Sequence, residues 1–487
     1  MSTAVLGKKR DMDMTKGSII KNLLTFAFPL LLGNLFQQLY NMVDTYVIGQ
    51  TGVNEAYAAV GSVAPIINIL IGSFMGLAGG VGVIISQNFG AKKFESVERV
   101  THTAIILTAI LSVVFTVLGI VLTPLFLNLM LRADANSNAI FPYAKQYLTI
   151  YFAGVSGLLF YNMGAGILRA IGDSNRPFYF LLVSAILNVI FDCVFVFGFN
   201  MGVDGVAYAT IIAQGISAII TVITLFKTTS CVKLSVSKMK IDKNMLGKIF
   251  KIGTPSALQM AFTAFSNLFV MSYISNVNGD TTLALSGWTT YSKVDMIIFM
   301  PIQSIALAVT TFVGQNLGVN NEKRARKGVN VAVLITIIAT VIIMIPIIIF
   351  APYIASIFNK DAGVVEYATL FLRYITPFYL LSCFNQNYMS ALRGAGNTKV
   401  PMIMMLSGFI GVRQLYLFIM STFISHDPIP IGLSYPVGWL ACMLGVTIYY
   451  FTTNLSKFRL VDDTITTKTT KDVSIVTKNA TPNIKEN

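Results

Sequence analysis

The sequence predicts an all-α membrane protein with twelve transmembrane helices in two pseudo-symmetric six-helix bundles. Of the 487 residues, 55% are hydrophobic and only 11% are charged, whereas soluble globular proteins carry about 25% charged residues. Long apolar stretches recur along the whole chain, and about 20 such residues cross the hydrocarbon core of a bilayer as a helix. Three sequence motifs also occur twice in the same order, which indicates an internal duplication.

The repeated motifs relate the first half of the chain to the second. The three pairs are Phe28–Leu30 with Thr254–Ser256, Ser86–Gly90 with Gly314–Gly318, and Ala165–Gly172 with Met389–Gly396. Each pair is separated by about 226 residues, which gives the two halves nearly one common spacing. A duplicated, membrane-embedded chain is typical of secondary transporters, in which the two halves move about a site between them.

Twelve apolar stretches are long enough to span the membrane as helices. They cover residues 19–48, 57–86, 101–128, 143–168, 178–199, 203–227, 247–275, 283–313, 328–351, 364–391, 401–424 and 432–454. Each half holds six spans, an even number, so both halves enter the membrane from the same side. The axis that relates the halves should therefore run along the membrane normal.

The spans divide the chain into five parts. These are a cytoplasmic N-terminal segment (1–18), an N-lobe (19–227), a cytoplasmic linker (228–246), a C-lobe (247–454) and a flexible cytoplasmic tail (455–487). Most of the 35 Lys and Arg residues fall in segments on the side of the N-terminus, and cytoplasmic loops are enriched in these residues. We therefore expect a multi-pass protein of the cell membrane with both termini in the cytoplasm.

Composition also excludes several classes of function. The net charge of +14 follows the topology rather than one patch, so we expect no nucleic-acid partner. The four cysteines are scattered and lack the paired spacing of a metal site or a disulfide framework. The sequence contains no phosphate-binding loop, no Gly-x-Ser-x-Gly motif and no histidine-rich segment. We expect no catalytic residues, no enzyme activity and no cofactor; the expected partners are small organic substrates and the lipid bilayer, and the expected state is a monomer.

Three acidic residues, Asp44, Asp192 and Asp295, fall inside predicted spans. Ionised groups at membrane depth are costly, and most of them mark ion paths or substrate sites. The first and fifth spans both start on the inner side, and Asp44 and Asp192 lie far along them. We therefore expect both acids in the outer half of the N-lobe.

Three polar side chains are predicted to lie in the same layer as these two acids. Tyr40 and Asn188 precede Asp44 and Asp192 by one helical turn, so they share their helix faces. Thr210, about 10 Å along the sixth span, reaches the same depth. Carboxylate, amide and hydroxyl oxygens suit Na⁺, for which Asp44, Asn188, Asp192 and Thr210 are the candidate ligands, and two close carboxylates also suit a shared proton. The alternatives are a solvated interfacial position for Asp44 and a polar packing contact for Asp192.

Asp295 has a different set of alternatives. Asp295 on the eighth span and Arg413 on the eleventh both reach mid-membrane, because these helices enter from opposite sides. A structural ion pair would offset the burial of both charges. The other interpretation gives Asp295 a role in substrate binding or coupling. Lys293 lies on the opposite face of the eighth span, where it lines the cavity or pairs elsewhere.

The two Gln-Asn-x-Gly motifs, Gln87–Gly90 and Gln315–Gly318, lie at predicted helix ends before basic loops. Glycine is a common helix C-cap, and the Lys and Arg residues that follow would complement the helix dipole. We therefore expect a structural role for both motifs.

The chain resembles the multidrug and toxic compound extrusion (MATE) family from about Gly17 to Phe451. The most specific matches are Pro29, Gln37–Thr45, the paired Gln-Asn-x-Gly and Leu-Arg-x-x-Gly segments, Asn188–Asp192 and Gly202–Thr210. The resemblance implies export of organic, often cationic, compounds in exchange for Na⁺ or H⁺. It also implies that Asp44, Asn188, Asp192 and Thr210 form a cation site in the first half, with Tyr40 beside it.

The chain departs from this family in its second half. Some members carry an acidic pair in the seventh and tenth helices, but here the seventh span has no acid and the tenth has only Glu366, near its outer end. We therefore expect coupling in the first half. The expected function is secondary active efflux of organic, cationic or amphipathic compounds in exchange for H⁺ or Na⁺ by alternating access. The alternative is a flippase for a lipid-linked saccharide, against which the scarcity of buried cations counts.

Overall fold

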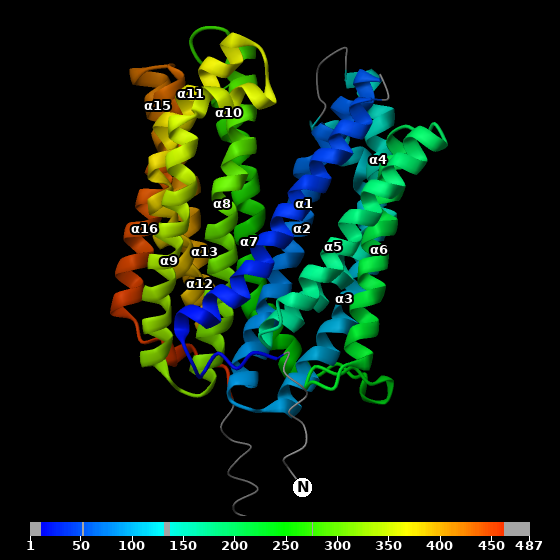
Figure 1. The fold of residues 1–487 in the computed structure, drawn as a ribbon, viewed down its shortest axis with the longest axis vertical. Helices are drawn as coiled ribbons and strands as arrows, with labels where there is room; N and C mark the ends of the chain where they lie inside the picture. Colours follow the sequence, from blue (N-terminus) through cyan, green and yellow to red (C-terminus); the bar gives the residue numbers. More distant parts are fainter. Residues whose placement is uncertain (1–10, 51–52, 131–136, 275, 462–487) are drawn as a thin grey trace, which may run out of the picture.

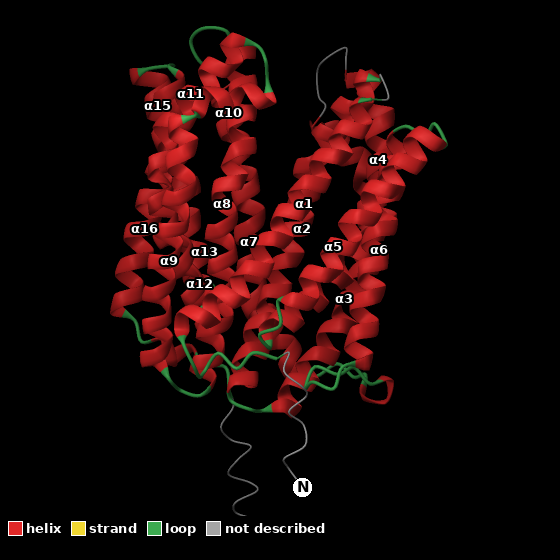
Figure 2. Cartoon of the chain, viewed as in Figure 1, coloured by secondary structure: helices red, strands yellow, loops and turns green. Residues whose placement is uncertain are grey.

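The computed structural model describes residues 11–50, 53–130, 137–274 and 276–461, and all regular elements among them are helices (Figure 2). The first half contains α1 (Ile19–Gly49), α2 (Asn54–Gly90), α3 (Phe94–Met130), α4 (Ser137–Ala170), α5 (Asn175–Asp192), η1 (Cys193–Gly198) and α6 (Val203–Lys227). The linker holds η2 (Val236–Lys238), and α7 (Lys243–Ile274), α8 (Thr281–Gly318), α9 (Glu322–Ile349) and α10 (Ala351–Phe358) follow. The remainder comprises α11 (Ala362–Ile375), η3 (Thr376–Phe378), α12 (Tyr379–Ala395), α13 (Lys399–Leu406), η4 (Ser407–Val412), α14 (Arg413–Ile419), η5 (Met420–Ile424), α15 (Pro428–Gly432), α16 (Ser434–Thr452) and η6 (Leu455–Phe458).

The prediction of an all-α protein with twelve spans is confirmed. Eleven helical segments in the described part of the chain are long and apolar enough to cross a membrane. The remaining span is divided into α11, with 14 residues, and α12, with 17 residues, by the 3₁₀ turn η3. Pro377 lies in this turn, and a proline removes one helical hydrogen-bond donor. The sequence predicted an unbroken helix here because hydropathy does not register such a break.

The two halves of the chain form two bundles, α1–α6 and α7–α16 (Figure 1). We call one end of the molecule the terminal face: there α1 begins, η6 lies, and short turns join α2 to α3 and α8 to α9. The bundles contact each other near this face, and their ribbons diverge toward the opposite face (Figure 1). The structure is therefore closed between the halves on the side of the terminal face.

Glycines permit this closure along α2 and α7. A Cβ atom added to Gly76 would lie 2.2 Å from the backbone nitrogen of Ala257, and one added to Gly80 would lie 2.8 Å from that of Gly253. Any side chain at these positions would separate the two helices, since backbones can approach so closely only over small residues. The glycine-rich stretch of α2 thus forms the seam between the bundles.

The glycines of the Gln-Asn-x-Gly motifs do not act as the predicted C-caps. Gly90 and Gly318 are the last helical residues of α2 and α8, and the positive φ angles fall two residues later, at Lys92 and Asn320 (both 58°). Gly90 is instead required because a Cβ there would lie 2.0 Å from the carbonyl oxygen of Gln315. Their role is therefore close contact between the bundles.

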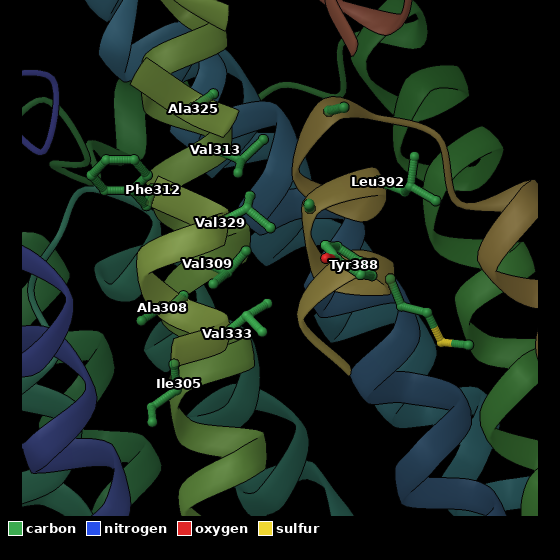
Figure 3. Packing of buried hydrophobic residues seen from close by; sticks show 14 of the residues in the cluster. Ile305, Ala308, Val309, Phe312, Val313, Ala325, Val329, Val333, Tyr388 and Leu392 are labelled. Atoms are coloured by element: carbon green, nitrogen blue, oxygen red, sulfur yellow. The ribbon is translucent and has the colours of Figure 1, made fainter. Parts of the chain in front are cut away.

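Apolar side chains fill the interior of each bundle. Figure 3 shows the cluster of the second bundle, in which Val313 of α8, Val329 of α9 and Leu392 of α12 are fully buried. Phe26 and Leu30 of α1 belong to the same cluster. The start of α1 therefore packs against the opposite bundle, which adds to the closure at the terminal face.

The prediction of a flexible tail over residues 455–487 is wrong for the first residues of this segment. Leu455 is fully buried, and its N–H donates to the Glu322 carboxylate at 3.2 Å, as the N–H of Ser456 does at 3.0 Å. An acid in the first turn of α9 thus fixes the chain beyond α16. Residues 462–487, and residues 1–10 of the predicted N-terminal segment, lie outside the described residues; the other domain boundaries stay predictions.

Candidate functional site

The five polar residues grouped from the sequence come from three neighbouring helices of the first bundle. Tyr40 and Asp44 lie on α1, Asn188 and Asp192 on α5, and Thr210 on α6. A buried apolar cluster joins α1, η1 and α6 beside them; it consists of Val47, Ile48, Val196 and Val206. This packing brings together polar groups that are far apart in the sequence.

The backbone geometry changes at Asp192. α5 ends at Asp192, and the chain continues as a π-helix through η1. Short π-helical segments are rare and are frequent at functional sites. Asp192 is fully buried, so the fold places a carboxyl group inside the bundle at this transition.

Buried polar atoms without a hydrogen-bond partner among the described residues gather at this place. They are Oδ1 of Asp44, both carboxyl oxygens of Asp192, both amide atoms of Asn188 and Oε1 of Gln214. Buried polar groups in folded proteins nearly always have a partner. Five of these six atoms are oxygens, which are acceptors and are therefore suited to a bound cation.

The two carboxyl groups lie close together. Those of Asp44 and Asp192 are near enough to affect each other's charge, although no hydrogen bond joins them, and neither has a Lys or Arg beside it among the described residues. Two ionised carboxylates at this separation would repel each other strongly in a low-dielectric interior. A proton that one shares with the other, or a Na⁺ between them, would remove this repulsion.

The remaining predicted members contribute hydroxyl groups. Tyr40 lies beside Asp44 and Gln37. The Thr210 hydroxyl donates to the carbonyl of Val206 on its own helix at 2.9 Å, which leaves its oxygen free to accept or to bind a cation. Within the described ranges, no group of three or more His, Cys, Asp or Glu could hold a metal ion. The donor set consists of hard oxygens, which suit Na⁺ or a proton.

Three further residues of this site were not predicted from the sequence. Tyr147 and Tyr151 of α4 stack with ring centroids 6.2 Å apart, and Tyr147 lies close to both acids. Tyr151 lies beside Gln214 of α6. A signal existed: the tyrosines are one helical turn apart on the fourth span, and Gln214 follows Thr210 by one turn.

The predicted ion pair between Asp295 and Arg413 is not formed. Arg413 is fully buried and donates to Oγ of Ser266 at 2.5 Å, Oδ1 of Asn267 at 3.1 Å and the carbonyl of Phe409 at 3.2 Å. Its guanidinium also lies 4.7 Å from the ring centroid of Tyr435. The prediction was wrong because neutral acceptors and an aromatic face, which periodicity does not reveal, solvate this cation.

Asp295 lies instead in an aromatic environment. Its carboxyl lies beside the Tyr291 hydroxyl, which lies 3.2 Å from the hydroxyl of Tyr379. Both tryptophans of the chain pack here: Trp288 contacts Tyr291 and Trp439 contacts Tyr379, each with ring centroids 4.9 Å apart. Asp295 is partly exposed, so it remains accessible to a bound molecule.

Lys293 does not join this group. Its ammonium lies 5.7 Å from the ring centroid of Phe358 on α10, and its side chain is exposed. The two sequence alternatives for Lys293, lining the cavity or pairing elsewhere, stay predictions.

Comparison with known proteins agrees with this architecture. The family model described as MatE matches residues 29–194 and 255–419, one match in each half. The "Probable multidrug resistance protein YoeA" of Bacillus subtilis is 27% identical over 449 residues, which cover 90% of this chain and 94% of that protein. The "FAD transporter" of Shewanella oneidensis is 25% identical over 359 residues, 72% of this chain and 76% of that protein. A solved structure of the outward-facing conformation of a multidrug resistance MATE family transporter has a TM-score of 0.84 at 22% identity, and the match covers 93% of this chain and 99% of that one. These comparisons do not favour the flippase alternative.

Proposed function

Since this chain belongs to the MATE family, whose members are transporters rather than enzymes, we propose that it exports organic compounds in exchange for a cation. The coupling ion is H⁺ or Na⁺, and it binds in the first bundle. The two bundles alternate between an arrangement closed at the terminal face and one closed at the opposite face.

The observation that carries this proposal is the group of unpartnered oxygens around Asp44 and Asp192. Each of these oxygens can accept, and neither carboxyl has a fixed cation beside it. A bound cation would neutralise the buried charge and stabilise one arrangement of the bundles over the other. Reversible neutralisation of this kind is what coupling requires.

The substrate class is supported by the surroundings of Asp295. A carboxyl among Trp288, Tyr291 and Tyr435 suits an organic cation, because aromatic faces and a carboxylate both attract positive charge. The names of the relatives point in two directions, toward multidrug resistance and toward the transport of FAD. We propose a cationic or amphipathic organic substrate.

The distribution of Lys and Arg supports an orientation with the terminal face in the cytoplasm of the cell. In that orientation, the arrangement described above is closed toward the cytoplasm. Cations from outside would load the first-bundle site, lower the affinity for substrate, and favour return to the arrangement that is open to the cytoplasm.

Proteoliposomes with separately imposed Na⁺ and H⁺ gradients test the proposal. We expect export of cationic dyes to follow one of the two gradients, and substrate affinity to fall as the outside concentration of that ion rises. This dependence should be lost in Asp44→Asn and kept in Glu366→Gln, which neutralises an exposed acid of the second bundle. If the dependence survives in Asp44→Asn and disappears in Asp295→Asn, the second bundle carries the coupling and the assignment fails. FAD in the substrate panel tests the anionic alternative.

A further inference from the structure

The two Gln-Asn-x-Gly motifs contact each other at the terminal face, and their contacts are reciprocal. A Cβ atom added to Gly90 would lie 2.0 Å from the carbonyl oxygen of Gln315, and one added to Gly318 would lie 2.2 Å from that of Gln87. Each motif therefore places its glycine against the glutamine of the other.

The two glutamine side chains extend this contact across the seam. Nε2 of Gln87, in the first bundle, donates to the carbonyls of Gly394 and Ala395 in the second, both at 2.9 Å. Nε2 of Gln315, in the second bundle, donates to the carbonyl of Ala170 in the first at 3.2 Å. Both side chains are fully buried. Each glutamine thus bonds the end of the other bundle's Leu-Arg-x-x-Gly helix.

The chain before α1 supplies the hydrogen-bond donor for the amide oxygen of Gln315. The N–H of Met14 donates to Oε1 of Gln315 at 2.8 Å, and the Met14 side chain is fully buried in the core of the second bundle. The same segment is anchored to the first bundle at its start, where Arg176 of α5 lies 3.6 Å from the Asp11 carboxylate and Ser230 of the linker donates to it at 2.6 Å. Residues 11–17 therefore run across the seam from one bundle to the other.

The chain after α16 supplies the hydrogen-bond donor for the amide oxygen of Gln87. The N–H of Leu460 donates to Oε1 of Gln87 at 2.7 Å, and its side chain packs against the core of the first bundle. The start of this segment is fixed to the second bundle by Glu322. Residues 455–461 therefore cross the seam in the opposite direction.

Equivalent glycines lie under the two crossing segments. A Cβ atom added to Gly172 (φ +89°) would lie 2.4 Å from the backbone oxygen of Met12. One added to Gly396 (φ +102°) would lie 2.7 Å from that of Phe458. A positive φ and this lack of space both require glycine. One segment precedes the first span and the other follows the last, so they are not sequence repeats, yet they occupy matching positions.

We propose that Gln87, Gln315 and the segments 11–17 and 455–461 form a terminal clasp that holds the terminal face closed, and that its opening is a step of the transport cycle. Each glutamine amide is fully hydrogen-bonded only while the halves are in contact. Its Nε2 bonds the opposite bundle, and its Oε1 bonds a terminal segment that crosses the seam. Water can replace these bonds when the halves separate, so the clasp stabilises the closed arrangement without making it permanent. This proposal rests on the proposed function in one respect: it requires the two halves to move relative to each other.

Distance measurement between spin labels tests the clasp without substrate or coupling ion. Labels are attached at Glu95→Cys and Lys323→Cys, exposed positions at the terminal ends of α3 and α9. The four native cysteines are first replaced by alanine or serine. In the double variant Gln87→Ala/Gln315→Ala, we expect the population with a long separation to rise several-fold over the parent.

Asn88→Ala is the matched control, since Asn88 is a buried amide of the same motif whose Nδ2 donates to Ile84 of its own helix at 2.8 Å. If the double alanine variant fails to fold, Gln87→Glu/Gln315→Glu keeps the acceptors for the terminal segments and removes the donors across the seam. A distance distribution that matches the Asn88→Ala control in both double variants would overturn the clasp. Failure of ion coupling in transport assays would leave this result unaffected, so the two proposals fail separately.

Discussion

At matching positions, the first bundle buries acidic groups and the second buries a basic one. Tyr40 and Asn41 of α1 correspond in the repeat to Ser266 and Asn267 of α7. In the first bundle, this turn of helix lies beside Asp44, whose carboxyl has an unpartnered oxygen. In the second bundle, Ser266 and Asn267 accept hydrogen bonds from the buried guanidinium of Arg413.

The difference separates a reversible ion site from a fixed one. Arg413 keeps its own positive charge, and three neutral acceptors with an aromatic ring stabilise it, although its Nη1 has no hydrogen-bond partner among the described residues. Asp44 and Asp192 have no Lys or Arg beside them among the described residues, and in the proposed function an exchangeable cation neutralises them. On this proposal, the two halves share a scaffold, but the first offers a place for a mobile cation where the second holds the guanidinium of Arg413.

The largest effect is expected for Asp192→Asn. An amide of nearly the same shape would preserve packing, but it could not carry a negative charge that a cation neutralises. Coupled export should fall to the background of empty liposomes, with normal expression and membrane insertion. Full activity of this variant in the proteoliposome assay would mean that Asp192 is only a packing residue, and the contrast between the bundles would disappear.

Arg413→Lys should reduce stability rather than coupling. A lysine cannot contact Ser266, Asn267 and the face of Tyr435 together, and hydrogen bonds to charged groups contribute about 1.5–3 kcal/mol each. We expect a loss of about 2–3 kcal/mol, measured by thermal unfolding in detergent. Arg373→Lys, at an exposed position of α11, is the control and should change the unfolding temperature little. Loss of ion dependence with unchanged stability would contradict a fixed role for Arg413.

Tyr147→Phe should weaken ion affinity moderately. The hydroxyl close to both acids is removed while the stacked ring remains, and one hydrogen bond of about 1 kcal/mol corresponds to an affinity roughly fivefold weaker. The concentration of Na⁺ or H⁺ that gives half-maximal export measures this change. Tyr353→Phe on α10, where the side chain is exposed, should behave as the parent does. An equal shift in both variants would remove Tyr147 from the site.

The smallest effect is expected for the coupling between Asp295 and Arg413. A direct buried ion pair loses about 3–5 kcal/mol when one partner is removed. Since no such pair forms here, a double-mutant cycle of Asp295→Asn and Arg413→Lys should give an interaction energy below about 1 kcal/mol. A larger value would show that the two charges meet in another arrangement of the bundles.

The sequence was sufficient for the number of spans and for the helix faces of the acids, although it missed the break at η3 and misassigned the C-caps of α2 and α8. Apolar length predicted the spans, and the one-turn spacing of Tyr40 with Asp44 and of Asn188 with Asp192 predicted their shared faces. It was insufficient where the partner comes from another helix. The acceptors of Arg413, the contact of Gln87 with Gly394 and the burial of Met14 all depend on how helices pack, and neither hydropathy nor periodicity specifies this.

The reciprocal packing of the two motifs around Gly90 and Gly318 also has a consequence for ancestry. Contacts in which each copy of a surface meets the other copy are the isologous contacts of twofold-symmetric dimers. A six-helix precursor with a single Gln-Asn-x-Gly motif could therefore have assembled as a homodimer through this surface, with both subunits inserted in the same orientation. Fusion of two such subunits through a segment like 228–242 would have kept the interface and freed each copy to change its charges independently.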